Sequence, residues 1–345
     1  MTEIPAGSVG ETFDAPVLVL VDLETPRASA AEAVSLLAPS RAGLALVAGA
    51  AALTRADVVA LALGPVGADA SAALAGAGAT RVLAADLGQA GTQAGVVADA
   101  LVSAVRTVKP AVALVLSDYH GKEVAARAAV LLGSACTADA SDLRVREGAL
   151  TASKTVLSGS WSTTLRIGGA GTTPVVAVRA PEVEVPGPAA PVAVEALDVV
   201  LTPESLAVRV VSREPAPTAS GPDLAGARTV VVAGRGVGGD IDLVRSLADP
   251  LGAAVGATRV VCDEGWLERS AQVGQTGVSI APRLYIGLGV SGAIHHTSGI
   301  QGAGTVVAVC DDAEAPIFQM ADFGVVGDVT TVVPQLVEEL DRLRA

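Results

Sequence analysis

Short apolar runs alternate with Ala- and Leu-rich segments along most of this 345-residue sequence, and this alternation limits the accessible folds more than any other feature. The apolar runs of the first half have the length and Val content of buried parallel strands. They lie at residues 16–22, 57–63, 81–84 and 111–116. Helical segments follow at residues 29–52, with an interruption at Pro39, and at 69–77, 92–108 and 121–132. Strands that alternate with helices predict a parallel sheet covered on both faces.

The pattern changes in the middle of the chain. Residues 143–179 are rich in Thr, Ser and Val without a helical period, which predicts additional strands that we expect to be antiparallel. Residues 181–217 are rich in Pro, Val, Glu and Ala and are interpreted as a connecting segment with one or two strands, including one at 207–211. Residues 214–227 have the Pro, Ser and Gly content of a domain linker.

A second α/β region follows the linker. Its expected strands lie at residues 228–232, 258–262, 283–288 and 305–310, and its expected helices at 240–251, 292–299 and 330–343. Pro334 is expected in the first turn of the last helix, where a missing N–H costs little. We therefore expect an N-terminal three-layer α/β domain with a mostly parallel sheet and a C-terminal doubly wound, Rossmann-like domain. The expected boundaries are 1–213 for the first domain, with extra strands at about 143–211, 214–227 for the linker and 228–345 for the second domain.

Charge and composition exclude several classes of function. The net charge of −13 opposes binding to nucleic acids and to anionic membrane surfaces, because both need clustered Lys and Arg. The three cysteines lie far apart without a C-x-x-C pair, so neither a metal site nor a disulfide framework is expected. No apolar run reaches the roughly 18 residues of a membrane span, and no targeting segment is visible. A cytoplasmic location is the resulting expectation.

The sequence GRGVGG at 234–239 follows an expected strand and precedes an expected helix. It matches the G-x-G-x-x-G pattern of turns in which backbone N–H groups bind a diphosphate. Arg235 adds a positive donor inside the turn. Two alternatives remain open at this point: a glycine-rich turn that binds nothing, and an NAD-dependent dehydrogenase in which Asp263 or Glu264 binds the ribose. The dehydrogenase lacks a separate acid–base pair.

Four further polar stretches follow or precede expected strands. They are QVGQTG at 272–277, SGAIHH at 291–296, the acidic run DDAE at 311–314 and DYHGK at 118–122. Each has an ordinary structural alternative: a turn, a capped helix with solvated histidines, a solvated loop, or a polar strand-to-helix turn. Adjacent histidines rarely chelate a metal together. Asp118 and His120 could form a catalytic pair, but no G-x-S-x-G elbow supports a hydrolase, and a polar turn is favoured. No catalytic or metal-ligating residue is therefore predicted.

Taken in order, the C-terminal motifs resemble the alpha subunit of the electron transfer flavoprotein family. They are GRG at 234–236, GATRVVCDEG at 256–265, QVGQTGV at 272–278, LYIGLGVSGAIHH at 284–296 and CDDAEAPIFQMADFGVVGD at 310–328. The N-terminal half resembles the family in architecture and in its opening strand, PVLVLVDLE. The resemblance implies a non-catalytic electron carrier with one FAD per chain, in a heterodimer with a beta subunit that holds AMP. A flavin-bifurcating member would hold a second FAD there instead.

The resemblance also implies partners and site residues. The electron donors would be flavin dehydrogenases of the acyl-CoA dehydrogenase type, as in fatty acid beta-oxidation, and the acceptor a quinone oxidoreductase or another protein. The residues implied in FAD binding are Gly234, Arg235, Gly236, Thr258, Arg259, Val273, Gly274, Gln275, Thr276, Gly277, Gly289, Ser291, Gly292, Ala293, His296, Cys310, Asp311 and Asp328.

Individual roles follow from the resemblance as well. Arg259 would lie near the isoalloxazine ring and stabilise its reduced, anionic form, because a cation there favours added negative charge. Thr276 would bond the ring around N5, and His296 would lie near the carbonyl O2. Residues 291–293 would bind the diphosphate together with Gly274 and Arg235, and Asp328 would hold the adenosine end.

Several positions depart from the family pattern. The family's Ser before the Arg is Thr258, and its Gln before the His is His295. The Lys after QTG is Val278, which removes one cation near the flavin. Cys310 and Asp311 replace an Asn and a Lys. These changes predict altered adenosine contacts and an altered flavin potential in a divergent member of the family.

Overall fold

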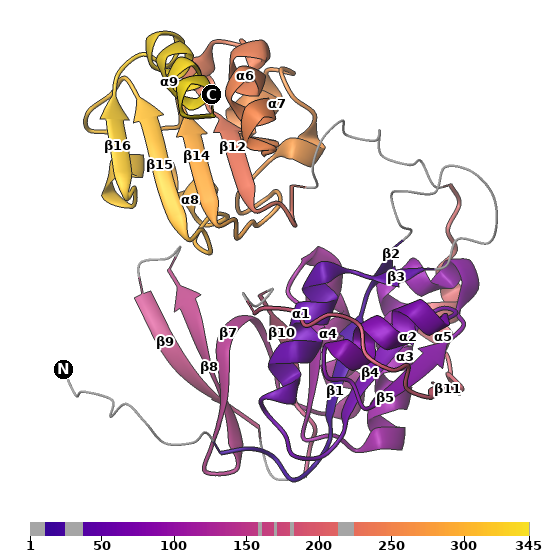
Figure 1. The fold of residues 1–345 in the computed structure, drawn as a ribbon. Helices are drawn as coiled ribbons and strands as arrows, with labels where there is room; N and C mark the ends of the chain where they lie inside the picture. The colour runs from indigo at the N-terminus through magenta and orange to yellow at the C-terminus, as the bar shows by residue number, and fades with distance from the viewer. Residues whose placement is uncertain are drawn as a thin grey trace. The chain divides into compact units, whose positions relative to one another are not determined.

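The computed structural model describes residues 11–24, 37–157, 161–168, 171–179, 183–212 and 224–344. The chain divides into two compact units, shown in indigo to pink and in orange to yellow in Figure 1. The first unit contains the elements from β1 to α5, and the second contains those from β12 to α9. Each unit has its own apolar core and is described by itself.

The first unit is built on one large sheet. Its described strands are ordered β11-β5-β4-β1-β6-β10-β7-β8-β9. The pairs from β11 to β7 are parallel, and β7 and β8 are antiparallel. The bounds are β1 (Val17–Val21), β4 (Val58–Leu63), β5 (Arg81–Ala85), β6 (Val112–Leu116), β7 (Cys136–Arg146), β8 (Ala149–Val156), β9 (Trp161–Ile167), β10 (Val175–Val178) and β11 (Val194–Ala196).

Helices cover both faces of this sheet. The strand β1 is buried along its whole length. Val17 and Val19 pack with residues of α1 and α2 on one face, whereas Leu18 packs with residues of α3 and α4 on the other. This arrangement confirms the predicted α/β fold. The helices are α1 (Arg41–Ala51), α2 (Ala68–Gly76), η1 (Gly88–Thr92), α3 (Ala94–Val108), α4 (Tyr119–Leu132) and α5 (Pro203–Ala207), and a small antiparallel pair joins β2 (Leu23–Glu24) to β3 (Ala38–Pro39).

The second unit contains a parallel sheet with the order β13-β12-β14-β15-β16. The chain begins in the interior at β12, passes to the edge strand β13, and returns to β14 on the other side of β12. The topological switch point of the sheet therefore lies between β12 and β14. The strands are β12 (Thr229–Ala233), β13 (Ala254–Ala257), β14 (Leu284–Leu288), β15 (Thr305–Cys310) and β16 (Phe323–Val326).

The two faces of the second sheet are covered differently. α6 and α9 pack against each other over one face, as Figure 1 shows. On the other face the core includes Val273, Ile300 and Ile317, which belong to the segments between the strands. The helices are η2 (Arg235–Val237), α6 (Ile241–Leu251), α7 (Arg259–Asp263), η3 (Arg269–Ala271), α8 (Ile294–Thr297), η4 (Pro316–Gln319) and α9 (Val329–Arg344).

Two predicted strands are wrong. Residues 258–262 do not form a strand: the strand is β13, which ends at Ala257, and Arg259 begins the short helix α7. Pairing with β12 makes a strand of a segment that its Ala and Gly residues alone do not favour. Residues 207–211 are not a strand either, because α5 occupies Pro203–Ala207 and no strand follows it in the described residues up to 212.

Other expectations need smaller corrections. The helix expected at 29–52 begins at Arg41, because Pro39 belongs to β3 and Ser40 caps the helix by accepting a hydrogen bond from the Gly43 N–H. Residues 29–36 of that expectation, and 214–223 of the expected linker, lie outside the described residues. The strand β10 is parallel to both neighbours, not antiparallel. Pro334 lies inside α9, beyond its first turn.

Candidate functional site

The glycine-rich loops after β12 and β14 meet at the switch point. The Gly234 N–H donates to the carbonyl oxygen of Leu288 at 2.8 Å, and the Gly236 N–H donates to that of Gly289 at 3.0 Å. Ligands of open α/β sheets bind outside the carboxyl ends of the strands, at the switch point. The fold therefore places both predicted loops where a ligand is expected.

Glycine is required here because the two loops touch through their backbones. Gly289 has a φ of +63°, and a Cβ at this position would lie 2.6 Å from the Gly236 Cα. A Cβ on Gly234 would lie 2.1 Å from the Gly289 carbonyl oxygen. Close approach of this kind excludes any side chain. The glycines thus join the two loops, in addition to the diphosphate role that the sequence predicts.

A third loop, at residues 272–278, packs against the start of α8. The Val273 N–H donates to Ala257 at the end of β13, and the Gln275 N–H donates to the His295 carbonyl oxygen at 2.7 Å. Gly274 has a φ of +142°, and a Cβ on it would lie 2.5 Å from that same carbonyl oxygen. These contacts bring the third predicted motif to the same edge of the sheet as the other two.

Unused hydrogen-bond donors gather at this edge. Ser291, Gly292 and Ala293 form the loop between β14 and α8, and in the described part of the chain their backbone N–H groups donate to no acceptor. Arg235 is exposed in the neighbouring loop. Backbone N–H groups and a guanidinium together suit a diphosphate. The donors present therefore fit the anionic part of a dinucleotide.

His296 is buried beneath these loops, with 5 % of its surface exposed. Its Nδ1 lies 3.0 Å from the Val273 carbonyl oxygen and its Nε2 lies 2.8 Å from the Tyr285 hydroxyl. A carbonyl oxygen only accepts, so Nδ1 carries the hydrogen and the Tyr285 hydroxyl donates to Nε2. Burial lowers the pKa of His296 to about 4 and raises the pKa of Tyr285, so the pair is neutral.

Both ring nitrogens of His296 are therefore used within the protein. Its predicted position near a flavin carbonyl stays a prediction. Its neighbour His295 is exposed, and its Nδ1 lies 2.7 Å from Oε1 of Gln275. His295 thus links the 272–278 loop to α8 by side chains as well as by backbone.

A chain of polar side chains leads from α7 to the 272–278 loop. Arg259 places its Nε 3.3 Å from one carboxylate oxygen of Asp263, and Arg269 places its Nη2 2.7 Å from the other. Arg269 also donates from Nη1 to Gln272, whose side chain in turn donates to Thr276. Sequence reasoning missed Arg269 and Gln272 as site residues. Gln272 lies within a recognised motif, but its burial is visible only in the structure.

The residues predicted at the adenosine end have structural partners. Asp328 follows β16 and accepts from the N–H of Thr330 at 2.8 Å and from its hydroxyl at 2.7 Å, so it caps the start of α9. The Thr330 side-chain hydrogen bond lowers the pKa of Asp328. Cys310 is buried, with its Sγ 3.8 Å from Oδ1 of Asp311. Their contacts with a ligand stay predictions.

The stretch at 118–122 is a helix start. Asp118 follows β6 and accepts from the Gly121 N–H at 2.6 Å, which makes it the N-cap of α4. This contact supports the polar-turn interpretation over a catalytic Asp–His pair.

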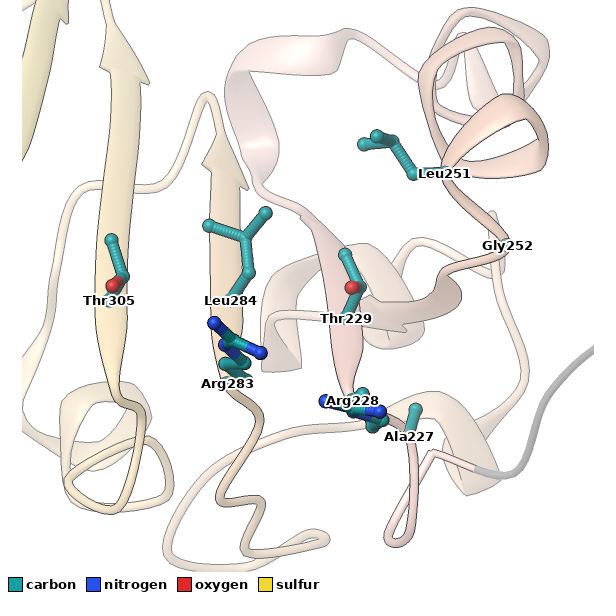
Figure 2. Close-up of a pocket in the computed structure, with 8 residues that line it drawn as sticks. All are labelled: Ala227, Arg228, Thr229, Leu251, Gly252, Arg283, Leu284 and Thr305. Atoms are coloured by element: carbon teal, nitrogen blue, oxygen red, sulfur yellow. The ribbon is translucent and has the colours of Figure 1, made fainter.

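A hollow of about 690 Å³ lies at the opposite edge of the second sheet. Figure 2 shows Arg228 and Arg283 at the tails of the arrows of β12 and β14, which are the amino ends of these strands. Both arginines are exposed. The hollow is open, and it lies away from the loops that carry the predicted motifs, so it is not the predicted site.

Comparison with known proteins decides the family. The family model described as electron transfer flavoprotein FAD-binding domain matches residues 223–301, and the one described as electron transfer flavoprotein domain matches residues 37–202. The electron transfer flavoprotein subunit alpha of Mycobacterium leprae is 43% identical over 247 residues, which cover 70% of this chain and 75% of that protein. This chain belongs to the electron transfer flavoprotein alpha-subunit family.

Further relatives agree with this assignment. The subunit alpha of Mycobacterium tuberculosis is 39% identical over 244 residues, 70% of this chain and 75% of that protein. The mitochondrial subunit alpha of Arabidopsis thaliana is 50% identical over 121 residues, 34% of this chain and 33% of that protein. The predicted family, its flavoprotein character and its FAD-binding domain are thereby confirmed. The FAD-binding match includes the three loops described above and ends before Cys310.

Proposed function

We propose that this chain is the FAD-carrying alpha subunit of a heterodimeric electron transfer flavoprotein. The observation that carries the proposal is the convergence of loops after β12, β13 and β14 at the switch point, within the region that matches an FAD-binding domain. The loops present unused backbone N–H groups and exposed arginines. FAD supplies reversible uptake and release of electrons, and the protein supplies its binding, orientation and electrostatic surroundings.

The residues divide into three groups by what they offer. The N–H groups of Ser291, Gly292 and Ala293, with Arg235 between Gly234 and Gly236, would bind the diphosphate. Gly274 would lie at the diphosphate as well. The side chains of Thr258, Arg259 and Thr276 would face the isoalloxazine ring, with Gln275 and Gly277 alongside. His296 would lie near the carbonyl O2, and Gly289 would support these loops. Cys310, Asp311 and Asp328 would lie toward the adenosine. One FAD per chain is proposed.

We also propose the partners that the family assignment suggests. A beta subunit would complete the heterodimer and hold AMP, or a second FAD if the complex is flavin-bifurcating. Flavin dehydrogenases of the acyl-CoA type would donate electrons, and a quinone oxidoreductase or another protein would accept them. The proposed domains are 1–213, a linker at 214–227 and 228–345, and the proposed location is the cytoplasm. In the described part of the chain, no helix has the length and hydrophobicity to cross a membrane.

An electron carrier is favoured over an NAD-dependent dehydrogenase by the contacts of Asp263. A dehydrogenase of the Rossmann type needs a carboxylate that is free to bind the ribose hydroxyls. Both oxygens of Asp263 are occupied by arginines, Arg259 and Arg269. Asp263, one of the two carboxylates considered for the ribose in the dehydrogenase alternative, therefore has another role, which leaves Glu264 as the other candidate.

Co-expression with a beta subunit tests the proposal. The purified heterodimer should be yellow, and denaturation followed by chromatography should release one FAD for each alpha chain. FMN, or no flavin, would overturn it, and two FAD per heterodimer would favour the bifurcating form. Expressed alone, the alpha chain should be poorly flavinated. A monodisperse, fully flavinated monomer would contradict the need for a beta subunit.

A further inference from the structure

We propose that Arg269 and Gln272 are positioning residues that hold the Thr276 hydroxyl as a hydrogen-bond donor toward bound FAD. The inference rests on the proposed function, because Thr276 must face the flavin. It adds two side chains that do not themselves need to touch the cofactor.

The observation is a directed chain of hydrogen bonds. Nη1 of Arg269 lies 3.3 Å from Oε1 of Gln272, and Nε2 of Gln272 lies 2.9 Å from Oγ1 of Thr276. Asp263 holds the other end through Nη2 of Arg269 at 2.7 Å. The chain thus begins at a carboxylate and ends at a hydroxyl in the predicted flavin loop.

The direction of each bond follows from the chemistry of the groups. A guanidinium only donates, so the oxygen of the Gln272 amide faces Arg269 and its NH₂ group faces Thr276. An amide nitrogen also only donates, so Oγ1 of Thr276 accepts. The hydroxyl hydrogen of Thr276 is then left for another acceptor. Without Arg269 the amide could turn over, present its oxygen to Thr276 and take up that hydrogen.

The surroundings keep Gln272 in place. Its exposed fraction is 2%, and its backbone donates to Arg269 and accepts from Val278 at 2.7 Å. A Cβ on Gly277 would lie 2.1 Å from the Gln272 carbonyl oxygen, so the turn closes tightly on this residue. Thr276 itself is exposed, and within the described residues no acceptor is found for its hydroxyl hydrogen.

A donor at this position matches the rim of an oxidised flavin. The rim carries the acceptor atoms N1, O2, O4 and N5, and a single donor at N3. Arg259 shares Asp263 with Arg269, so one carboxylate fixes both the cation and, through Gln272, the hydroxyl donor. Arg269 is exposed and lies outside the recognised motifs. It would act on the orientation of the Thr276 hydroxyl through the side chain of Gln272.

The decisive substitution is Gln272→Glu in the complex with the beta subunit. A carboxylate only accepts, so Thr276 must donate to it and loses its hydrogen for the flavin. The Kd for FAD should rise roughly 3- to 10-fold, the value of one neutral hydrogen bond, and the flavin absorption maximum should shift. Arg269→Met, which allows the amide to turn over, should show a smaller change in the same direction. Arg269→Lys should restore wild-type values, because an ammonium group also only donates.

A double-mutant cycle separates hydrogen-bond direction from the added negative charge. Gln272→Glu should raise the Kd for FAD by a certain factor in the wild-type background. In a Thr276→Val background that factor should be smaller by about 3-fold or more, because no hydroxyl remains to be turned. Equal increases in both backgrounds, or wild-type FAD affinity in both Gln272→Glu and Arg269→Met, would overturn the inference. Arg269 is exposed, so Arg269→Met should keep the fold, which thermal unfolding checks. A wild-type complex without FAD would instead refute the proposed function.

Discussion

Polar groups at the carboxyl ends of the strands are hydrogen-bonded differently in the two sheets. In the first unit, Ser117 and Asp139 bond each other, Lys122 pairs with Asp139 at 2.7 Å, and Asp118 caps α4. In the second unit, the backbone N–H groups of the 291–293 loop have no acceptor among the described residues. The named groups of the first edge bond to one another or cap a helix, although the buried Nε2 of His120 beside them has no partner among the described residues, whereas the second edge leaves several backbone donors unpaired.

Glycine contacts account for much of this difference. In the first unit, Gly121 lies close to the Leu116 carbonyl oxygen, within a single strand-to-helix connection. In the second unit, Gly289 brings two separate connections together, because it touches Gly236 in the loop after β12. Two loops that share a backbone contact converge on one point of the edge. The parallel sheet places the loops at the same edge. The glycines let their backbones come into contact there.

The largest expected effect comes from breaking that backbone contact. Gly289→Ala adds a Cβ at 2.6 Å from Gly236 in a residue with a φ of +63°. The left-handed conformation costs about 1–2 kcal/mol and overpacking about 1–3 kcal/mol. We expect a loss of about 3 kcal/mol in the free energy of unfolding, measured by urea denaturation, together with loss of FAD.

Gly252→Ala is the matched control. Gly252 ends α6 with a φ of +58°, and a Cβ there would meet nothing within 4 Å. Only the conformational cost of about 1–2 kcal/mol applies, and FAD should stay bound. Equal losses in the two variants would mean that the contact between the loops contributes nothing.

The next effect concerns acid stability of the second unit. The folded-state pKa of His296 is about 4, below the ordinary value of about 6.5. Below about pH 6.5 the unfolded chain binds a proton that the folded chain excludes, so stability falls as the pH drops and the loss is complete near pH 4. The slope should approach about 1.4 kcal/mol per pH unit.

Urea denaturation at several pH values between 7 and 4 measures this slope. The range spans the ordinary pKa of histidine and the lowered pKa of His296. His296→Gln should flatten the profile, since Gln does not titrate, while lowering stability at neutral pH. His295→Gln at the exposed neighbouring position is the matched control. A profile that keeps its slope in His296→Gln would assign the acid sensitivity to other groups.

The sequence predicts most of the fold because its strongest signals are local. The continuous burial of 17–21 and 58–62 follows from Val- and Leu-rich runs that cannot be anything other than interior. The strand at Ala254–Ala257 was misplaced because Ala and Gly carry little β preference, and only its pairing with β12 makes it a strand. Val260 and Val261 favour a strand by composition, yet they lie in α7 after the cap at Thr258.

The site was predictable as a set of motifs but not as a network. Glycine spacing indicates where loops approach a ligand, so the positions from 234 to 293 could be selected before the fold was known. The link from Arg269 to Thr276 depends on a buried amide and on distances across several residues. No pattern of residue types encodes the direction of those hydrogen bonds.

A smaller effect is expected when a positive charge is removed from the carboxyl edge of the second sheet. Arg259 is 67% exposed in its side chain and is held by Asp263. Arg259→Ala should lower the first reduction potential of the bound FAD by tens of millivolts, because a cation favours the anionic reduced ring. About 1.4 kcal/mol corresponds to about 59 mV for one electron, and solvent exposure reduces the effect.

Spectroelectrochemical titration measures this shift. Arg245→Ala removes an equal charge from an exposed position in the interior of α6 and should leave the potential near that of the wild type. If Arg259→Ala retains FAD and its potential is also unchanged, Arg259 serves only to anchor α7 through Asp263.

The smallest effect on stability is expected at the carboxyl edge of the first sheet. Lys122→Met removes the ion pair with Asp139, whose two partners are only about one-third to two-fifths exposed, at 41% and 32%. Asp139 keeps its bonds with Ser117, at 2.9 Å through its N–H and at 3.0 Å through its carboxylate. A partly exposed pair contributes about 0–1 kcal/mol, so the free energy of unfolding should fall by less than about 1 kcal/mol. FAD content and flavin potential should match the wild type, since Ser117 and Asp139 keep their bonds to each other at this edge. A change in either would show that the first edge also contributes to the flavin site, and the contrast between the two edges would fail.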